Sequence, residues 1–199
     1  MLTCHNNSSL VVDKLCDHTR EQNTAVTCFY FDFAARKEQT AINMLGSLLR
    51  QMISRARMIP EDIRQELREQ RQVVSGRKPR LGDIVKILQL MTSSQRTFMI
   101  IDALDECTAP QRFRLFDSLK EILQKSPGTR ILVTGRPHIC PEIETRLAGR
   151  VTSISLGPTR NDIIKFLRVR LSEDETPDAM DESLEVDILH RIPGTISDT

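Results

Sequence analysis

Two short segments of the sequence are apolar without interruption, and each ends in a polar residue. The first is FMIID, residues 98–102, and the second is ILVT, residues 131–134. A strand with one face in solvent alternates apolar and polar side chains, whereas a strand that is buried on both faces does not. Such strands are typical of parallel sheets that carry helices on both sides. The two segments therefore predict an α/β protein with a parallel sheet.

The rest of the chain fits an alternation of strands and helices. Segments 25–33 and 151–156 are also rich in β-branched or aromatic residues, so we expect four strands: 25–33, 97–102, 130–134 and 151–156. Between them, apolar residues recur at helical spacing. Region 41–91 reads as an all-helical insertion between two strands. Strands that alternate with helices predict right-handed crossovers and a layered fold.

The composition excludes several classes of function. Lysine and arginine total 28 and aspartate and glutamate total 27, so the net charge of +1 provides no overall field that would attract nucleic acid or anionic lipid. No apolar run reaches the about 18 residues that a membrane-spanning helix needs. The five cysteines show no C-x-x-C spacing, which argues against a disulfide framework or a zinc site. We expect a cytoplasmic protein that binds neither a specific nucleic acid nor a membrane.

The strongest chemical signal is the segment FMIIDALDEC, residues 98–107. Asp102 ends an apolar strand, which places it at the carboxyl edge of the sheet, where open α/β folds bind ligands. An aspartate at this position can hold Mg²⁺ through a water while the ion bridges the phosphates of a nucleotide. Asp105 and Glu106 follow within one turn and could orient an attacking water. The alternative is that both acids begin the next helix, where its dipole favours them.

A second signal follows the next strand, in the segment RILVTGRPH, residues 130–138. It places Thr134 and Arg136 at the adjacent carboxyl edge. The planar guanidinium of an arginine there can bind the oxygens of a terminal phosphate. We therefore predict Asp102, Thr134 and Arg136 as nucleotide-binding residues. The alternative is that Gly135 and Pro137 make a turn that leaves Arg136 solvated.

The order of these segments along the chain resembles that of a NACHT domain: DHTREQNTAVTCFYFDF, then a helical insertion, then SSQRTFMIIDALDEC and finally KSPGTRILVTGRPH. The resemblance is to STAND-class signalling NTPases, in the nephrocystin-3-like N-terminal form that occurs in fungal proteins with ankyrin or WD repeats. It implies a P-loop NTPase-like three-layer sandwich with a parallel core that binds ATP or GTP with Mg²⁺. It also implies that Asp102 is the magnesium aspartate of a Walker B strand, Asp105 or Glu106 the hydrolytic acid and Arg136 a sensor arginine.

One part of the family pattern is missing. A central strand and a phosphate-binding loop, G-x-x-x-x-G-K-S/T, would come before the helix that reads SSLVVDKL, but residues 1–7 read MLTCHNN. No lysine of the chain follows a glycine, so the loop does not occur elsewhere. Without the backbone cradle and the lysine, nucleotide binding should be weaker by orders of magnitude. Ser8 and Ser9 could cap the helix, but their hydroxyls do not replace the cradle.

The missing strand also affects the expected sheet. In the family it lies in the middle, so its neighbours would keep unpaired backbone groups. Either the four remaining strands close up in a new order, or the chain is marginally stable by itself. We expect three regions: a stub outside the family pattern (1–7), a partial NACHT-type NTPase core (8–171), and an acidic linker that leads into a C-terminal helical region (172–199).

Two functions are consistent with these residues. The chain is either part of a NACHT-type nucleotide-binding signalling switch, which we do not expect to hydrolyse nucleotide alone, or a non-catalytic protein-interaction or scaffold module derived from such an NTPase. The resemblance implies protein partners that are reached through repeat or effector domains outside these residues, and self-association. The basic stretch 64–80 is a candidate contact surface. The alternative is a solvated helix face followed by a turn.

Overall fold

A computed structural model describes residues 4–20, 22–56, 58–73, 80–157, 159–173 and 182–197. It divides into two compact units, residues 1–151 and 152–199. The first unit contains α1 (Cys4–Thr19), β1 (Thr24–Tyr30), α2 (Ala41–Arg55), α3 (Glu61–Val73), α4 (Leu81–Ser94), β2 (Arg96–Asp102), η1 (Leu104–Glu106), α5 (Ala109–Lys125), β3 (Thr129–Val133), η2 (Pro137–Ile139) and α6 (Cys140–Arg146). The second contains α7 (Arg160–Ser172) and α8 (Glu182–Ser197). The predicted α/β class is confirmed, and α2, α3 and α4 form the predicted helical insertion.

The sheet of the first unit is parallel, with the order β1-β2-β3 in the part of the chain that the structure describes. Cys28 of β1 pairs with Ile100 of β2, which in turn pairs with Leu132 of β3. The central strand β2 is therefore the one that needs apolar side chains on both faces. Its residues Ile100 and Ile101 are 0 % and 1 % exposed, which explains the uninterrupted apolar sequence.

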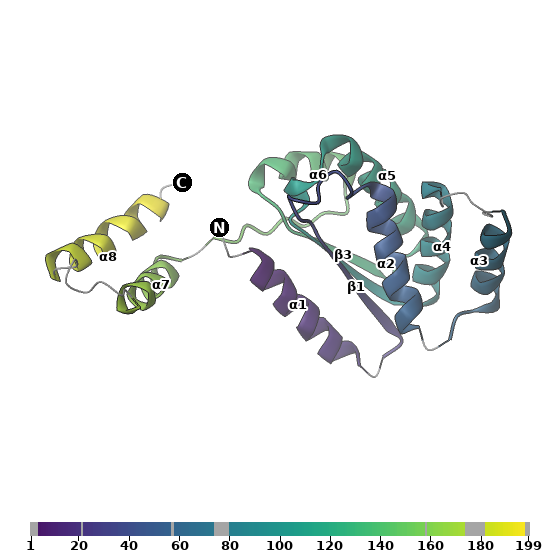
Figure 1. The fold of residues 1–199 in the computed structure, drawn as a ribbon, viewed down its shortest axis with the longest axis horizontal. Coiled ribbons are helices and arrows are strands. Elements are labelled where there is room, and N and C mark those ends of the chain that lie inside the picture. The colour runs from purple at the N-terminus through teal and green to yellow at the C-terminus, as the bar shows by residue number, and fades with distance from the viewer. Residues whose placement is uncertain are drawn as a thin grey trace. The chain divides into compact units, whose positions relative to one another are not determined.

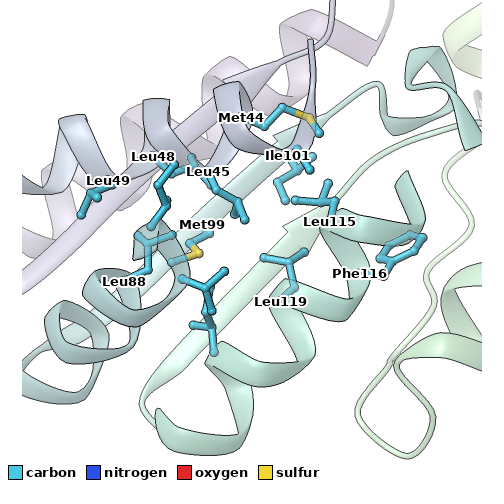
Figure 2. Packing of buried hydrophobic residues seen from close by; sticks show 14 of the residues in the cluster. Met44, Leu45, Leu48, Leu49, Leu88, Met99, Ile101, Leu115, Phe116 and Leu119 are labelled. Atoms are coloured by element: carbon cyan, nitrogen blue, oxygen red, sulfur yellow. The ribbon is translucent and has the colours of Figure 1, made fainter. Parts of the chain in front are cut away.

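Helices cover both faces of this sheet. Figure 1 shows α1 along one side of the sheet and α2, α4 and α5 on the other. The main apolar core lies on the side of α2, α4 and α5, where their leucines and methionines meet Met99 and Ile101 of β2 (Figure 2). Each fully buried leucine, isoleucine or methionine contributes about 1.5 to 3 kcal/mol relative to an exposed one. This core fixes the position of the strand that ends in Asp102.

The outer edge of β1 is closed by side chains of α2. The Cys28 N–H donates to Gln51 Oε1 at 3.0 Å, and Gln51 Nε2 donates to the Cys28 carbonyl at 2.7 Å. Arg55 Nη1 donates to the Val26 carbonyl at 2.8 Å. These bonds satisfy backbone groups that an edge strand would otherwise offer to another chain. The opposite edge of the sheet is β3.

The strand predicted at 151–156 is wrong. Residues 151–157 are irregular and exposed, with Ile154 at 75 % and Leu156 at 79 %. Composition alone does not make a strand, because its backbone also needs a neighbouring strand to bond to. No described strand pairs with this segment, and β3 remains an edge. The four expected strands therefore do not close up in a new order, while marginal stability of the isolated chain stays a prediction.

The first helix begins earlier than predicted. It starts at Cys4, because residues 4–7 contain no glycine or proline that would stop it. Ser8 and Ser9 consequently lie in its second turn, so their predicted role as caps is wrong. Residues 1–3 and most of the acidic linker, 174–181, lie outside the described residues. The predicted regions 8–171 and 172–199 stay predictions, although the compact units divide at residue 151.

The basic stretch 64–80 is only partly described. Arg64 and Arg68 both form ion pairs with Glu61 of the same helix, α3. Arg80 precedes α4, and its backbone N–H donates to Asp83 Oδ2 at 3.3 Å. Residues 74–79 lie outside the described residues, so a contact surface in this stretch stays a prediction. Among the helices that the structure describes, none has the length and apolar character needed to cross a membrane.

Candidate functional site

The carboxyl ends of β2 and β3 bring the predicted residues Asp102 and Thr134 together. Ile101 pairs with Val133, and Thr134 continues this pairing one residue beyond β3. Its N–H donates to the Ile101 carbonyl at 3.0 Å, and its carbonyl accepts from the Leu104 N–H at 2.9 Å. The backbone of Thr134 is thus bonded on both sides of Asp102, to Ile101 of β2 and to Leu104 of η1. This bonding sets the direction in which its side chain leaves the sheet.

Asp102 is completely buried, and two hydroxyl groups donate to one oxygen of its carboxylate. Its Oδ1 accepts from Thr134 Oγ1 at 2.5 Å and also from Ser8 Oγ. Ser8 is 1 % exposed and comes from α1, which lies against β1 and β2. A buried carboxylate is tolerated only where such donors replace its lost water. Residues 94 positions apart in the sequence therefore form one hydrogen-bonded group.

The chain turns sharply after Asp102. Ala103 adopts a left-handed conformation with φ 56°, which costs a residue with a side chain about 1 to 2 kcal/mol. The Ala103 N–H donates to Thr134 Oγ1 at 3.1 Å. The Thr134 hydroxyl therefore accepts from Ala103 and donates to Asp102 at the same time. We infer that this bond holds the turn in its strained form and directs the chain into η1.

The turn η1 carries Asp105 and Glu106 toward Arg136. The Arg136 Nε lies 3.2 Å from Asp105 Oδ2, and its Nη2 lies 3.8 Å from Glu106 Oε1. The Arg136 N–H also donates to Asp105 Oδ1 at 3.3 Å. The Asp105 side chain is 8 % exposed and that of Arg136 56 %. The guanidinium is accordingly held at the surface, where solvent weakens its attraction to the acids.

Gly135 allows this close approach. A Cβ at this position would lie 2.5 Å from Ile139 Cδ1 and 3.3 Å from Asp105 Oδ1. Ile139 is buried in the core, so it has little room to move away. A side chain between Thr134 and Arg136 would therefore push Ile139 out of its place in the core.

The edge thus holds two adjacent groups of side chains with different chemistry. Ser8, Asp102 and Thr134 present oxygen atoms, the ligands that Mg²⁺ prefers. Asp105, Glu106 and Arg136 form an ion-paired cluster. Within the described ranges, no group of three or more His, Cys, Asp and Glu side chains is placed to hold a metal ion. Ser8 and Asp102 are the buried oxygen donors of this edge, and a role for them in holding Mg²⁺ stays a prediction.

The sequence predicted five of these six residues by position, and their roles stay predictions. Sequence reasoning missed Ser8, which it took for a helix cap. A signal was present, because the last position of the pattern G-x-x-x-x-G-K-S/T falls on Ser8 when the pattern is laid over residues 1–8. In this chain Asn6 and Asn7 stand where the pattern requires glycine and lysine.

A comparison with protein families identifies the chain's relatives at the family level. The family model described as Nephrocystin 3, N-terminal, matches residues 8–136, which is more than half of the chain. The match begins at Ser8 and ends at Arg136, so it encloses both groups of side chains at the carboxyl edge. No curated protein matches the chain, and neither does any solved structure.

Proposed function

Because the chain belongs to the nephrocystin 3 N-terminal family, we propose that it is a NACHT-type signalling domain that binds the magnesium side of ATP or GTP. The observation that carries this proposal is the convergence of the Ser8 and Thr134 hydroxyls on buried Asp102. In this proposal β2 is the Walker B strand. The domain acts as a nucleotide-dependent switch in the cytoplasm, with effector or repeat domains outside these residues.

Each residue of the edge then has a role in binding. Asp102 and Ser8 would hold Mg²⁺, which neutralises phosphate charge when it is bound. Thr134 fixes the orientation of the Asp102 carboxylate through its 2.5 Å hydrogen bond. Arg136 is more than half exposed, so its side chain can leave the two acids and reach a phosphate oxygen. Its departure frees Asp105 and Glu106, either of which can then accept a proton from water.

We propose binding without efficient hydrolysis. The chain has no glycine-lysine pair, so no loop of this sequence supplies the usual cradle for the β- and γ-phosphates. The remaining contacts include two side-chain oxygen ligands, which predicts weak binding that depends on magnesium. The ion pairs of Arg136 with Asp105 and Glu106 favour a second function. A domain whose sensor arginine stays neutralised would act as an interaction module without nucleotide.

Isothermal titration calorimetry of the full chain with ATP and GTP, with and without Mg²⁺, separates the two functions. The switch function predicts binding that requires Mg²⁺ and is lost in Asp102→Asn. The matched control is Asp117→Asn, which removes an acid whose side chain is 67 % exposed and should leave binding unchanged. Circular dichroism checks that each variant is folded. Absence of binding with Mg²⁺ present contradicts the switch function and favours the interaction module.

A further inference from the structure

The side chains of α2 close only part of the outer edge of β1. Gln51 bonds both backbone groups of Cys28, and Arg55 bonds the Val26 carbonyl. Because every second residue of a strand turns its N–H and C=O to the same side, Thr24 and Val26 share the outward direction of Cys28. No hydrogen bond of the described residues uses the Val26 N–H or the Thr24 carbonyl. The amino end of this edge is therefore open.

The two open groups are the pair that a parallel strand needs. A residue added in parallel opposite Ala25 donates its N–H to the Thr24 carbonyl and accepts from the Val26 N–H. An antiparallel strand would instead need both groups of Val26 or both groups of Thr24. Arg55 occupies the Val26 carbonyl at 2.8 Å, and the Thr24 N–H donates to the Gln22 carbonyl at 2.8 Å. The open groups accordingly select a parallel chain.

A pocket of about 470 Å³ lies at the open end of the edge, and both Thr24 and Val26 line it. The pocket is also lined by residues of α1 and α2, the helices that pack against β1 (Figure 1). Its volume is within the about 300 to 1,000 Å³ that is typical of ligand pockets. Met52 and Ala56 provide an apolar wall on the side of α2. A ligand in this pocket can therefore bond to β1 and bury an apolar group.

The pocket carries positive charge. Arg20 and Arg55 line it, and no acidic side chain does so among the described residues. Arg20 forms an ion pair with Asp17 at 3.9 Å, whereas none of the ion pairs in the described ranges involves Arg55. Arg55 uses one N–H for the Val26 carbonyl, and a guanidinium has five. Its remaining donors suit a carboxylate, whose planar shape matches the guanidinium.

We propose that this pocket binds the carboxyl terminus of a partner polypeptide, which adds to the edge of β1 as a parallel strand. A chain that runs parallel to β1 leads toward Arg55, whose guanidinium occupies the place of the next residue. The chain must therefore end opposite Ala25. There its terminal carboxylate accepts from the Val26 N–H and pairs with Arg55. The last side chain lies on the same side of the sheet as Ala25, toward Met52, which favours an apolar last residue.

The inference does not depend on nucleotide binding. Thr24 pairs with Arg96 at the amino end of the sheet, whereas Tyr30 pairs with Asp102 at the carboxyl end. The pocket and the candidate nucleotide site therefore lie at opposite ends of the strands. Recognition uses main-chain groups and one carboxylate, so it tolerates different sequences ahead of the last residue. One defined peptide is enough to test it.

Fluorescence anisotropy with the full chain and a labelled peptide tests the proposal. The probe is a hexapeptide of serine, threonine and valine that ends in leucine, with fluorescein at its amino end. We expect the peptide with a free carboxylate to bind, and the same peptide with a terminal amide to bind about tenfold more weakly or worse. Arg55→Gln should weaken binding of the free acid to the same extent. Arg50→Gln, at an exposed arginine of α2 outside the pocket, should bind like the unmodified chain.

Amide hydrogen exchange measured by NMR tests the register. The Val26 amide should exchange about tenfold or more slowly when the peptide is bound, because its N–H then donates to the carboxylate. The Cys28 amide, which donates to Gln51, is the internal control and should be protected with and without peptide. Both readouts on the unmodified chain are independent of whether Arg55→Gln folds.

Four results would overturn the proposal. The first is equal binding of the acid and amide peptides, and the second is no binding at about 1 mM peptide. The third is slow exchange of the Val26 amide in the free chain, which would assign this N–H to a partner within the chain. The fourth is binding of N-acetyl-leucine as strong as that of the hexapeptide, which would assign the pocket to small organic acids.

Discussion

Replacing Thr134 by valine removes one hydroxyl and leaves the volume and shape of the side chain nearly unchanged. That hydroxyl donates to Asp102 Oδ1 at 2.5 Å and accepts from the Ala103 N–H at 3.1 Å. In the variant, the buried Asp102 carboxylate therefore has one hydrogen-bond donor fewer. The N–H of Ala103, which lies in a left-handed turn, loses its acceptor. No cavity is created, so the effect reports on these two hydrogen bonds.

The magnitude follows from the two bonds. A hydrogen bond to a charged group contributes about 1.5 to 3 kcal/mol, and a buried donor left without a partner costs about 1 to 3 kcal/mol. Thr134 is only half-buried, so water recovers part of this loss. We expect Thr134→Val to lower the free energy of unfolding by about 2 to 4 kcal/mol. The melting temperature should fall by about 5 to 15 °C.

Urea unfolding followed by far-ultraviolet circular dichroism measures this loss, since the chain has no tryptophan for fluorescence. Thr134→Ser is the matched control, because it keeps the hydroxyl and removes only a methyl group. The serine variant should retain most of the stability. If valine and serine destabilise the protein equally, or if valine changes the free energy of unfolding by less than about 0.5 kcal/mol, the assigned role of the hydroxyl is wrong.

Three further predictions concern other parts of the first unit. Gly135→Ala should cost about 1 to 3 kcal/mol by crowding Ile139, whereas Gly157→Ala, with open space around its Cβ, should be neutral in the same unfolding assay. Burial raises the pKa of the Cys107 thiol to about 11, so mass spectrometry at pH 8 should find it unreactive toward iodoacetamide in the folded protein. The folded state then holds this proton more tightly than the unfolded state, so stability should fall as the pH rises from about 9 to about 11; reaction as fast as in urea would contradict this. Gln51→Leu leaves the Cys28 N–H and carbonyl of β1 without partners and should lower the free energy of unfolding by about 1 to 3 kcal/mol in the same assay.

The sequence predicts the centre of this fold better than its margins. The segments FMIID and ILVT indicate a buried parallel sheet because burial on both faces requires an uninterrupted run of apolar residues, which can be seen in the local sequence. Segment 151–156 has a similar composition, yet it forms no strand. The difference lies in pairing, since β2 has a neighbour on each side and the segment 151–156 has none among the described strands. Pairing is a property of two segments and cannot be read from one.

The candidate site shows the same division. Asp102 and Thr134 are predictable because each stands at or just beyond the end of an apolar strand, and the ends of parallel strands meet at one edge. Ser8 contacts Asp102 from another layer, through the packing of α1 on the sheet, which no local pattern specifies. The sequence does not predict the left-handed conformation of Ala103 either, because alanine ordinarily avoids this conformation. Contacts of this kind depend on the tertiary fold.

Comparison of Ser8→Ala with Ser9→Ala in magnesium-dependent nucleotide titrations tests the central claim most directly. The two serines are neighbours on α1, but the claim assigns the hydroxyl of Ser8 alone to the Asp102 carboxylate and the magnesium ion. We predict that Ser8→Ala weakens binding of ATP or GTP by about tenfold or more when Mg²⁺ is present, while Ser9→Ala matches the unmodified protein. Equal affinities for magnesium-bound nucleotide in both variants and the unmodified protein would contradict the account.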